Sequence, residues 1–158
     1  MPYQIAVCGP RTCTEREAAD AFMVGRLLAE RGVVVVCGGG DGVMGAVAAG
    51  VRSADGMVIG VRPGGDRVGA STDLSAVIVT NMGEARNAVI AWSADAVVVI
   101  GGSWGTLSEV ALARRRGDVP VISLGGWRVL DAAGDPVPGI TFVATAAEAV
   151  AGATRGRT

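Results

Sequence analysis

Short apolar runs alternate with longer amphipathic segments along nearly the whole chain. Runs such as VVVVC at 33–37 and AVVVI at 96–100 have the length of buried strands. Strands of this kind, separated by helices, are typical of a parallel sheet that is covered on both faces. We predict strands at 3–8, 33–37, 57–61, 76–80, 96–100, 119–124 and 140–143.

The segments between these strands have the periodicity and end signals of helices. Thr14 is followed three residues later by Glu17, a spacing that predicts a capping box. Helices are predicted from about Thr14, at 42–54, 84–94 and 105–116, and at the closing segment TAAEAVAGATR. We therefore predict one α/β domain over residues 1–154, with a Rossmann-like parallel sheet and helices on both faces, and a frayed tail at 155–158.

Length and hydropathy narrow the class of protein. The chain has 158 residues, of which half are hydrophobic, and its mean hydropathy is +0.45. Its apolar runs are much shorter than the roughly 20 residues of a membrane helix, and no secretory signal is visible at the N-terminus. We expect a cytoplasmic protein with no membrane partner.

Two missing residue types exclude several chemistries. The chain contains no histidine, which excludes Ser-His-Asp and Cys-His nucleophiles and makes a zinc site improbable. It also has no lysine, so it can form neither a pyridoxal phosphate Schiff base nor a Walker-type phosphate site. The net charge of -1 gives no general attraction to nucleic acid, and we expect no nucleic-acid partner and no metal.

Cysteine and the densest basic run have simple structural interpretations. Cys8, Cys13 and Cys37 lack a CxxC spacing, and we interpret each as a small apolar residue near a strand end. The run 114–116 is three arginines, which we interpret as the solvated C-terminal end of a helix, where cations are favourable.

Glycine follows five of the predicted strands. The segments are CGP at 8–10, CGGGDG at 37–42, RPGG at 62–65, IGGS at 100–103 and LGG at 124–126. In an open parallel sheet these strand ends lie along one edge, where ligands bind. Tight turns use glycine for their own reasons, but five such loops at one edge favour a phosphate or nucleotide crevice. The candidate binding residues in the first two loops are Gly9, Gly38, Gly39, Gly40 and Gly42.

The segment GDGVMG at 40–45 matches the GxGxxG pattern of dinucleotide-binding proteins. It follows the second predicted strand rather than the first, and the next strand ends in Arg62 instead of the acidic residue that holds a ribose. We therefore favour a loop that binds a single phosphate over an NAD site.

The stretch IGGSWGTLSE at 100–109 predicts a second anion site with a carboxylate beside it. Gly101 and Gly102 permit a sharp turn, and the segment 103–106 would direct backbone N–H groups at a phosphate. The candidate residues in this segment are Ser103, Trp104, Gly105 and Thr106. Glu109 follows one helical turn later, where it could meet a sugar hydroxyl or water; the alternative is a simple interaction with the helix dipole.

Arg86 lies in the first turn of the preceding predicted helix, at the same edge of the predicted sheet. Its guanidinium keeps its charge at any working pH, which suits phosphate binding or orientation of a carboxylate better than proton transfer. The alternative is an exposed arginine that pairs with Glu84.

These motifs together resemble the LOG family, formerly labelled "lysine decarboxylase-like". The similarity rests on GGGDGVMGAV at 38–47, VIGVRP at 58–63, EARN at 84–87 and SADAVVVIGGSWGTLSEVALA at 93–113. Within the family, the pattern is most similar to the branch that includes molybdenum cofactor carrier proteins. The resemblance covers roughly residues 3–125 and implies the same Rossmann-like fold.

The resemblance also implies an activity and its residues. Active LOG proteins hydrolyse the N-glycosidic bond of nucleoside 5'-monophosphates, need no cofactor, and carry the signature PGGxGTxxE with an upstream Arg-Lys pair. Arg86, Gly105, Thr106 and Glu109 match these positions, and Arg86 and Glu109 would be the catalytic pair. In this chain Gly101 replaces the proline, Ser103 the second glycine and Asn87 the lysine, and the glycine loop GGGDGVMG at 38–45 is one residue shorter than the usual form.

Three functions stay open at this point. A phosphoribohydrolase would use Glu109 to activate water and to stabilise the ribose. A carrier would hold the molybdenum cofactor, a pterin phosphate, in the same crevice without chemistry. A nucleotide sensor is the third, although the sequence shows no effector domain. Trp104 either stacks on the ligand ring or covers the sheet edge, and we expect a homodimer, as is usual in the family.

Overall fold

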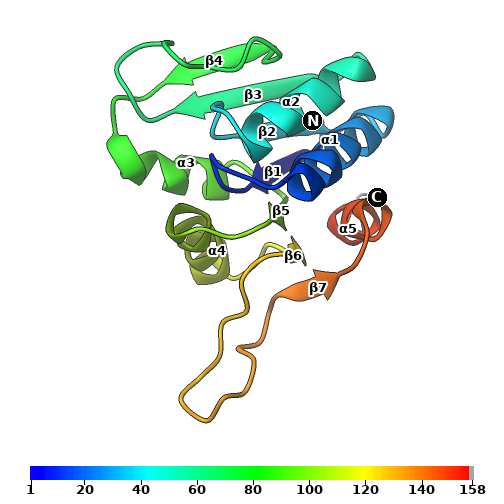
Figure 1. Cartoon of the computed structure of the whole chain (residues 1–158), viewed down its shortest axis with the longest axis vertical. Helices are drawn as coiled ribbons and strands as arrows, with labels where there is room; N and C mark the ends of the chain where they lie inside the picture. The colour runs from blue at the N-terminus through cyan, green and yellow to red at the C-terminus, as the bar shows by residue number, and fades with distance from the viewer. Residues whose placement is uncertain (157–158) are drawn as a thin grey trace.

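The computed structural model describes residues 1–156, which form one parallel sheet of seven strands (Figure 1). The strands are β1 (Gln4–Cys8), β2 (Val34–Cys37), β3 (Met57–Arg62), β4 (Ala76–Val79), β5 (Ala96–Ile100), β6 (Val121–Leu124) and β7 (Thr141–Val143). Their order in the sheet is β4-β3-β2-β1-β5-β6-β7, and every neighbouring pair is parallel. The predicted Rossmann-like α/β fold is confirmed.

Helices cover both faces of the sheet, as predicted. They are α1 (Glu15–Glu30), α2 (Val43–Ser53), the 3-10 turn η1 (Gly83–Ala85), α3 (Arg86–Trp92), α4 (Trp104–Arg116) and α5 (Ala146–Ala153). Buried residues of α1, α2 and α5 form one apolar cluster with the sheet, and buried residues of α3 and α4 form a second cluster. The sheet is thus the middle of three layers.

The alternation of side chains along β1 explains why the sheet is covered twice. Ile5 and Val7 belong to the cluster with α1, α2 and α5, whereas Ala6 and Cys8 belong to the cluster with α3 and α4. All four side chains are buried, and burial of a valine or isoleucine side chain contributes roughly 1.5–3 kcal/mol. Cys8 therefore lies under the layer that also carries Arg86 and Glu109.

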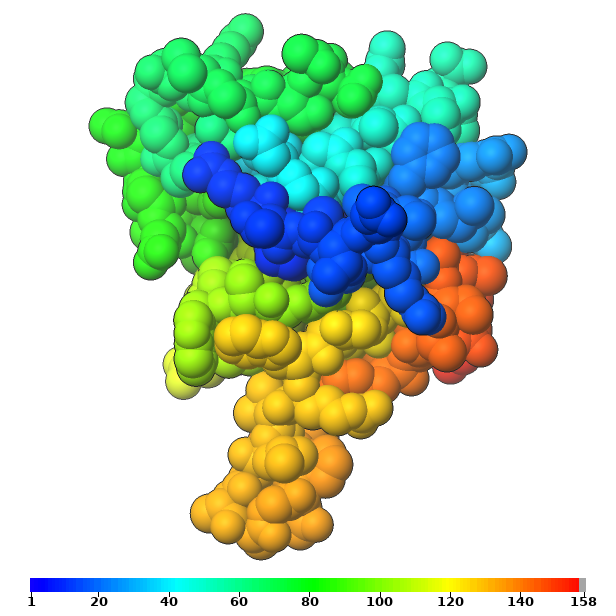
Figure 2. Space-filling model, in the orientation of Figure 1, coloured from blue at the N-terminus to red at the C-terminus, as the bar shows by residue number. Residues whose placement is uncertain are grey.

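Most element boundaries agree with the sequence predictions to within a few residues. The capping box of α1 is present, because the backbone N–H of Glu17 donates to Thr14 Oγ1 (3.2 Å) and that of Thr14 donates to the Glu17 carboxylate (2.8 Å). The helix predicted at 84–94 differs, since it begins as η1 and its α-helical part ends at Trp92. The segment between β6 and β7 is a long loop that projects from the body of the protein (Figure 2).

The structure describes the C-terminal end of the chain as far as residue 156. After α5 the described chain continues as a turn, and residues 157–158 of the predicted frayed tail lie outside the described residues. Within residues 1–156, none of the helices combines the length and the apolar character that crossing a bilayer requires.

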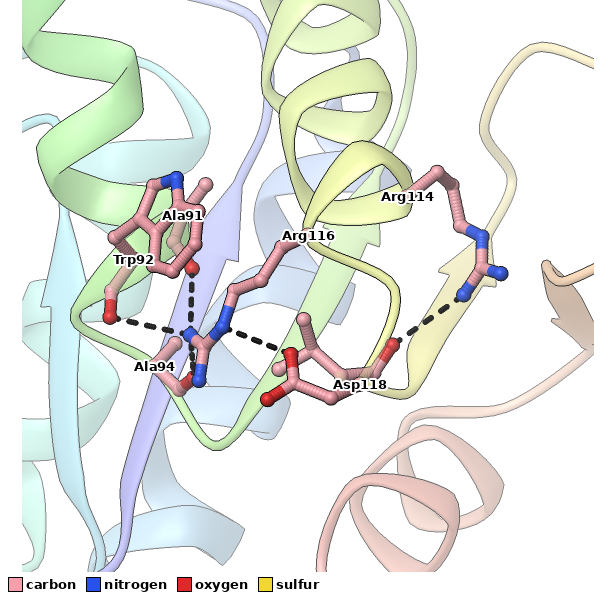
Figure 3. Close-up of polar contacts among 7 residues, drawn as sticks. Ala91, Trp92, Ala94, Arg114, Arg116 and Asp118 are labelled. Carbon is pink, nitrogen blue, oxygen red and sulfur yellow. Dashed lines mark hydrogen bonds and ion pairs between the residues drawn. The ribbon is translucent and has the colours of Figure 1, made fainter.

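The basic run at the end of α4 is solvated only in part, which corrects the sequence interpretation. The Arg116 side chain is 17% exposed, and its Nη1 donates to the carbonyl oxygens of Ala91 (3.1 Å), Trp92 (3.1 Å) and Ala94 (2.7 Å). Its Nε forms an ion pair with Asp118 at 2.9 Å (Figure 3). Arg116 thus satisfies carbonyl groups at the end of α3, which links the C-terminal ends of α3 and α4.

Candidate functional site

A cavity of about 310 Å³ opens at the carboxyl edge of the sheet, next to α3 and α4. It lies where β1 and β5 are adjacent and lead into helices on opposite faces of the sheet, which is the switch point where Rossmann-like folds bind ligands. The predicted residues that line it are Gly9, Gly38, Arg86, Asn87, Ser103, Gly105, Thr106 and Glu109. The segments that resemble the LOG signature therefore converge on one cavity.

Glu109 is a buried carboxyl group on the cavity wall. It lies in the second turn of α4, and the residue is 8% exposed. Burial raises the pKa of Glu109 to about 7, while the charge of Arg86 and a hydrogen bond from the Cys8 thiol act in the opposite direction. A carboxyl group with this pKa can exchange a proton with water or substrate near neutral pH.

Arg86 is held mainly by the backbone. Its Nη1 donates to the carbonyl oxygen of Gly38 (2.8 Å), which follows β2, and to that of Val61 in β3. Its Nε donates to Asn87 Oδ1 (3.0 Å). Burial lowers the pKa of Arg86, but an arginine remains charged at neutral pH. Over residues 1–156, Arg86 forms no ion pair within 4 Å, so the alternative pairing with Glu84 is absent.

Asn87 connects α3 to α4 at the position where LOG proteins carry a lysine. This buried side chain receives the Nε–H of Arg86 and donates through Nδ2 to Ser108 Oγ at 2.9 Å. Ser108 in turn donates to the carbonyl oxygen of Gly105 at 2.7 Å. The chain of hydrogen bonds fixes the Arg86 side chain relative to the first turn of α4.

The N-terminus of α4 has the features of an anion site. Ser103 is the N-cap, and its Oγ accepts from the backbone N–H of Thr106 at 3.1 Å and lies 3.0 Å from Thr106 Oγ1. In the described part of the chain, no protein acceptor contacts the backbone N–H of Gly105, which lines the cavity. This N–H and the positive end of the helix dipole favour a phosphate at this position.

The loop after β2 plays a different part from the one predicted for its glycines. Gly39, Gly40 and Gly42 are not among the residues that line the cavity. A β-carbon on Gly39 would lie 2.9 Å from Cα of Gly60 and 3.2 Å from Cδ of Arg62, and one on Gly40 would lie 3.1 Å from Nη1 of Arg62. Gly39 thus permits close approach of β3, and both glycines lie against the Arg62 side chain. Gly42 is the N-cap of α2 with φ of 64°, and a β-carbon there would lie 2.2 Å from the carbonyl oxygen of Arg11.

Gly101, Gly102 and Trp104 also lie away from the main cavity. Gly101 and Gly102 line a separate small pocket beside Trp127, and a β-carbon on Gly102 would lie 2.1 Å from the Trp127 ring. Trp104 is 78% exposed and packs edge-to-face against Trp127, with ring centroids 5.0 Å apart. Both predicted roles of Trp104 stay predictions, and its ring contact in the structure is with Trp127.

Sequence reasoning missed several residues of the cavity wall, among them Cys8, Arg11, Met44, Arg62 and Glu84. Arg62 had been considered only as the residue that stands where a dinucleotide site carries an acid. The signal for Arg62 was available, because it ends a strand at the same edge as the glycine loops. The signal for Arg11 and Met44 was weaker, since both positions depend on how the loops after β1 and β2 fold.

Comparison with known proteins relates the whole fold to characterised families. The SLOG cluster4 family pattern matches residues 2–150. The chain is 38% identical over 134 residues to an uncharacterized protein from Archaeoglobus fulgidus, covering 81% of this chain and 87% of that protein. It is 34% identical over 138 residues to the cytokinin riboside 5'-monophosphate phosphoribohydrolase of Mycobacterium tuberculosis, covering 82% and 74%.

Solved structures agree with these sequence matches. The molybdenum cofactor binding protein from Rippkaea orientalis superimposes with a TM-score of 0.85 at 30% identity, covering 96% of this chain and 94% of that protein. The fold and the comparisons therefore define a Rossmann-like α/β protein with a cavity at the carboxyl edge of its sheet. The chain belongs to the SLOG cluster4 family, and its resemblance to LOG proteins and to molybdenum cofactor carriers is confirmed.

Proposed function

We propose that this protein binds a nucleoside 5'-monophosphate and hydrolyses its N-glycosidic bond to free base and ribose 5-phosphate. The observation that carries the proposal is Glu109, a buried carboxyl group with a pKa of about 7 in a cavity that also contains Arg86 and the N-terminus of α4. The phosphoribohydrolase of Mycobacterium tuberculosis, at 34% identity, supports this class of reaction.

Glu109 has two tasks in the proposed reaction. As a carboxylate it accepts a proton from the water that attacks C1' of the ribose, and the base leaves with the electrons of the C1'–N bond and takes up a proton. General base assistance supplies about 10²- to 10⁴-fold, roughly 3–5 kcal/mol, whereas an enzyme lowers the barrier by at least about 8 kcal/mol. The negative charge of Glu109 must therefore also stabilise the positive charge that develops on the ribose.

The other groups position the nucleotide. The backbone N–H of Gly105 and the dipole of α4 bind the phosphate, which places the ribose near Glu109, one turn further along the helix. Acceptors on the protein occupy Nε and Nη1 of Arg86. Its Nη2 is therefore the nitrogen that can turn toward Glu109 or the substrate.

The proposal is tested by incubating the purified protein with a panel of nucleoside 5'-monophosphates and following free base by chromatography. Glu109→Gln keeps the shape of the side chain but removes the base, so we expect base release to fall by at least 10²-fold while nucleotide still binds. Glu30→Gln, at an exposed position on α1, is the control and should match the wild type. Unchanged release in Glu109→Gln would overturn the assignment of Glu109.

A carrier of the molybdenum cofactor is the second candidate, favoured by the close match to the Rippkaea orientalis protein. The residues present fit the phosphate and ring of such a pterin better than its metal. Burial raises the pKa of Cys37 to about 11 and that of Cys8 well above its ordinary value, so both thiols stay protonated and are poor metal ligands. Bound nucleotide with no base release from any member of the panel, together with retention of molybdopterin, would favour the carrier.

A further inference from the structure

Arg62 is a buried cation that the proposed reaction does not use. It ends β3, lines the cavity and is only 9% exposed. Its Nη2 donates to the carbonyl oxygen of Val68 at 2.9 Å, whereas its Nε is buried without an acceptor among residues 1–156. A buried donor without a partner is unfavourable, so a ligand that supplies acceptors to this guanidinium would remove a cost.

The loop after β2 lies against this side chain. Gly39 has φ of 73° and approaches the backbone of Gly60, and a β-carbon on Gly39 or Gly40 would also lie 3.2 or 3.1 Å, respectively, from Arg62. Arg86 lines the same cavity; burial lowers its pKa, the charge of Glu109 opposes this, and the charge of Arg62 adds to the lowering. Two guanidinium groups that line one cavity favour a ligand rich in acceptors.

The position of Arg62 in the sheet identifies the part of the ligand that it meets. The strand order β3-β2-β1-β5 places Arg62 three strand spacings, or about 14 Å, from the loop after β5 that begins α4. Arg86 is bonded to the ends of β2 and β3, between the two. A nucleotide with its phosphate at α4 and its ribose at Glu109 therefore directs its base toward Arg62. This orientation rests on the proposed phosphate site.

The chemistry of a guanidinium then restricts the ring. Arginine has donors only, arranged in a planar fork that matches two adjacent acceptors such as O6 and N7 of guanine. The oxygen and the adjacent ring nitrogen of a fully oxidised oxopterin form the same pair, whereas a reduced pterin carries hydrogen on that nitrogen and offers only its oxygen. Adenine instead presents an amino donor beside N7, which opposes the guanidinium. Glu84 also lines the cavity, and the backbone N–H of its neighbour Gly83 donates to the carbonyl oxygen of Pro63 (3.0 Å), the residue after Arg62. A carboxylate at this end suits the ring N–H that a 6-oxopurine carries and adenine lacks.

We propose that Arg62 is a specificity residue, which selects a ligand ring with adjacent oxygen and nitrogen acceptors, as in 6-oxopurines and oxopterins, against adenine. The selectivity should lie in the range of one well-formed bidentate pair, about 5- to 150-fold in affinity. The inference applies to a nucleotide that is hydrolysed and to an oxidised pterin phosphate that is carried; a reduced pterin would present only its oxygen to Arg62.

The test is a binding measurement in the Glu109→Gln background, so that no probe is consumed. Titration calorimetry would give the affinities of GMP, IMP, AMP and ribose 5-phosphate with Arg62 present and after Arg62→Met or Arg62→Lys. With Arg62 present, GMP and IMP should bind 5- to 150-fold more tightly than AMP. The ratio should fall to near 1 in Arg62→Met and to an intermediate value in Arg62→Lys, because an ammonium cannot span two acceptors.

Ribose 5-phosphate is the control, since it lacks the ring. Its unchanged affinity in Arg62→Met would show that the variant is folded and that the phosphate site is intact; if Arg62→Met does not fold, the ratio in Arg62→Lys decides. A GMP to AMP ratio near 1 with Arg62 present, or equal weakening of GMP and ribose 5-phosphate in the variants, would overturn the proposal. Absence of base release by the unsubstituted protein would contradict hydrolysis but leave these ratios unaffected.

Discussion

The guanidinium of Arg86 is bound by the carbonyl oxygens of Gly38 and Val61 and forms no ion pair with Glu109, although both side chains line one cavity. The two groups nevertheless influence each other through space, since Arg86 lowers the pKa of Glu109 and Glu109 raises that of Arg86. Arg86 is therefore placed to tune the protonation of Glu109 without neutralising it.

Replacement of Arg86 should shift the pH dependence of activity. With Arg86 present, the pKa of Glu109 is about 7, so kcat/KM should rise with pH through about 7 and then level off. In Arg86→Gln the opposing charge is lost, and the midpoint should move to higher pH by about one unit or more. The measurement is the pH profile of kcat/KM for base release. An unmoved midpoint would show that Arg86 acts only on the substrate.

Glu109 should make the protein less stable at alkaline than at acidic pH. Its folded pKa of about 7 lies above the unfolded value of about 4.3, so the unfolded state releases its proton first. The stabilisation that Glu109 gives to the folded state is fully present below about pH 4.3, and it decreases as the pH rises to about 7. Glu109→Gln removes this dependence. The unfolding free energy of the variant minus that of the wild type should therefore increase by on the order of 3 kcal/mol from pH 4 to pH 8. Urea unfolding at the two pH values measures this difference.

The matched control for that experiment is Glu30→Gln, because Glu30 is an exposed partner of Arg26 in a surface ion pair. The difference in unfolding free energy between Glu30→Gln and the wild type should change little between pH 4 and pH 8. Equal pH dependence in the two variants would contradict the raised pKa of Glu109.

Arg116 should contribute more to stability than its neighbour Arg115. Arg116 binds three carbonyl groups at the end of α3, whereas Arg115 is exposed. Arg116→Met leaves buried carbonyl groups without their charged donor and should cost about 1.5–3 kcal/mol of unfolding free energy. Arg115→Met should stay within about 0.5 kcal/mol of wild type. Chemical denaturation of both variants checks the difference, and similar values for the two would show that the contacts of Arg116 add nothing.

The expected homodimer should depend on the surface of α3 and α4. Trp92 is 63% exposed, and its ring stacks against the guanidinium of Arg116, with 5.2 Å between Arg116 Cζ and the ring centroid. A large exposed aromatic side chain of this kind is typical of an interface anchor. Trp92→Asp should shift the mass measured by light scattering from dimer to monomer. Met23→Asp, at an exposed apolar position on α1, should leave the mass unchanged.

The sequence predicted the parts of the site that follow from the strand pattern. Arg86 and Glu109 could be placed together because the ends of parallel strands share one edge of the sheet. The roles of Gly39 and Gly40 could not be predicted, since glycine that binds a ligand and glycine that makes room for Arg62 look alike in a sequence. The contacts of Arg116 depend on how α3 and α4 pack, which no local pattern encodes.

The cavity is assembled from loops that follow β1, β2, β3 and β5, together with the first turns of α3 and α4. Such loops tolerate sequence change while the strands that carry them stay fixed. Arg62 and Glu109 belong to different elements, β3 and α4, so a substitution at one end of the cavity leaves the element at the other end in place. One scaffold could in this way acquire new ligands without loss of its older chemistry, or lose the chemistry while it keeps the ligand, and so give rise to enzymes and carriers within a single lineage.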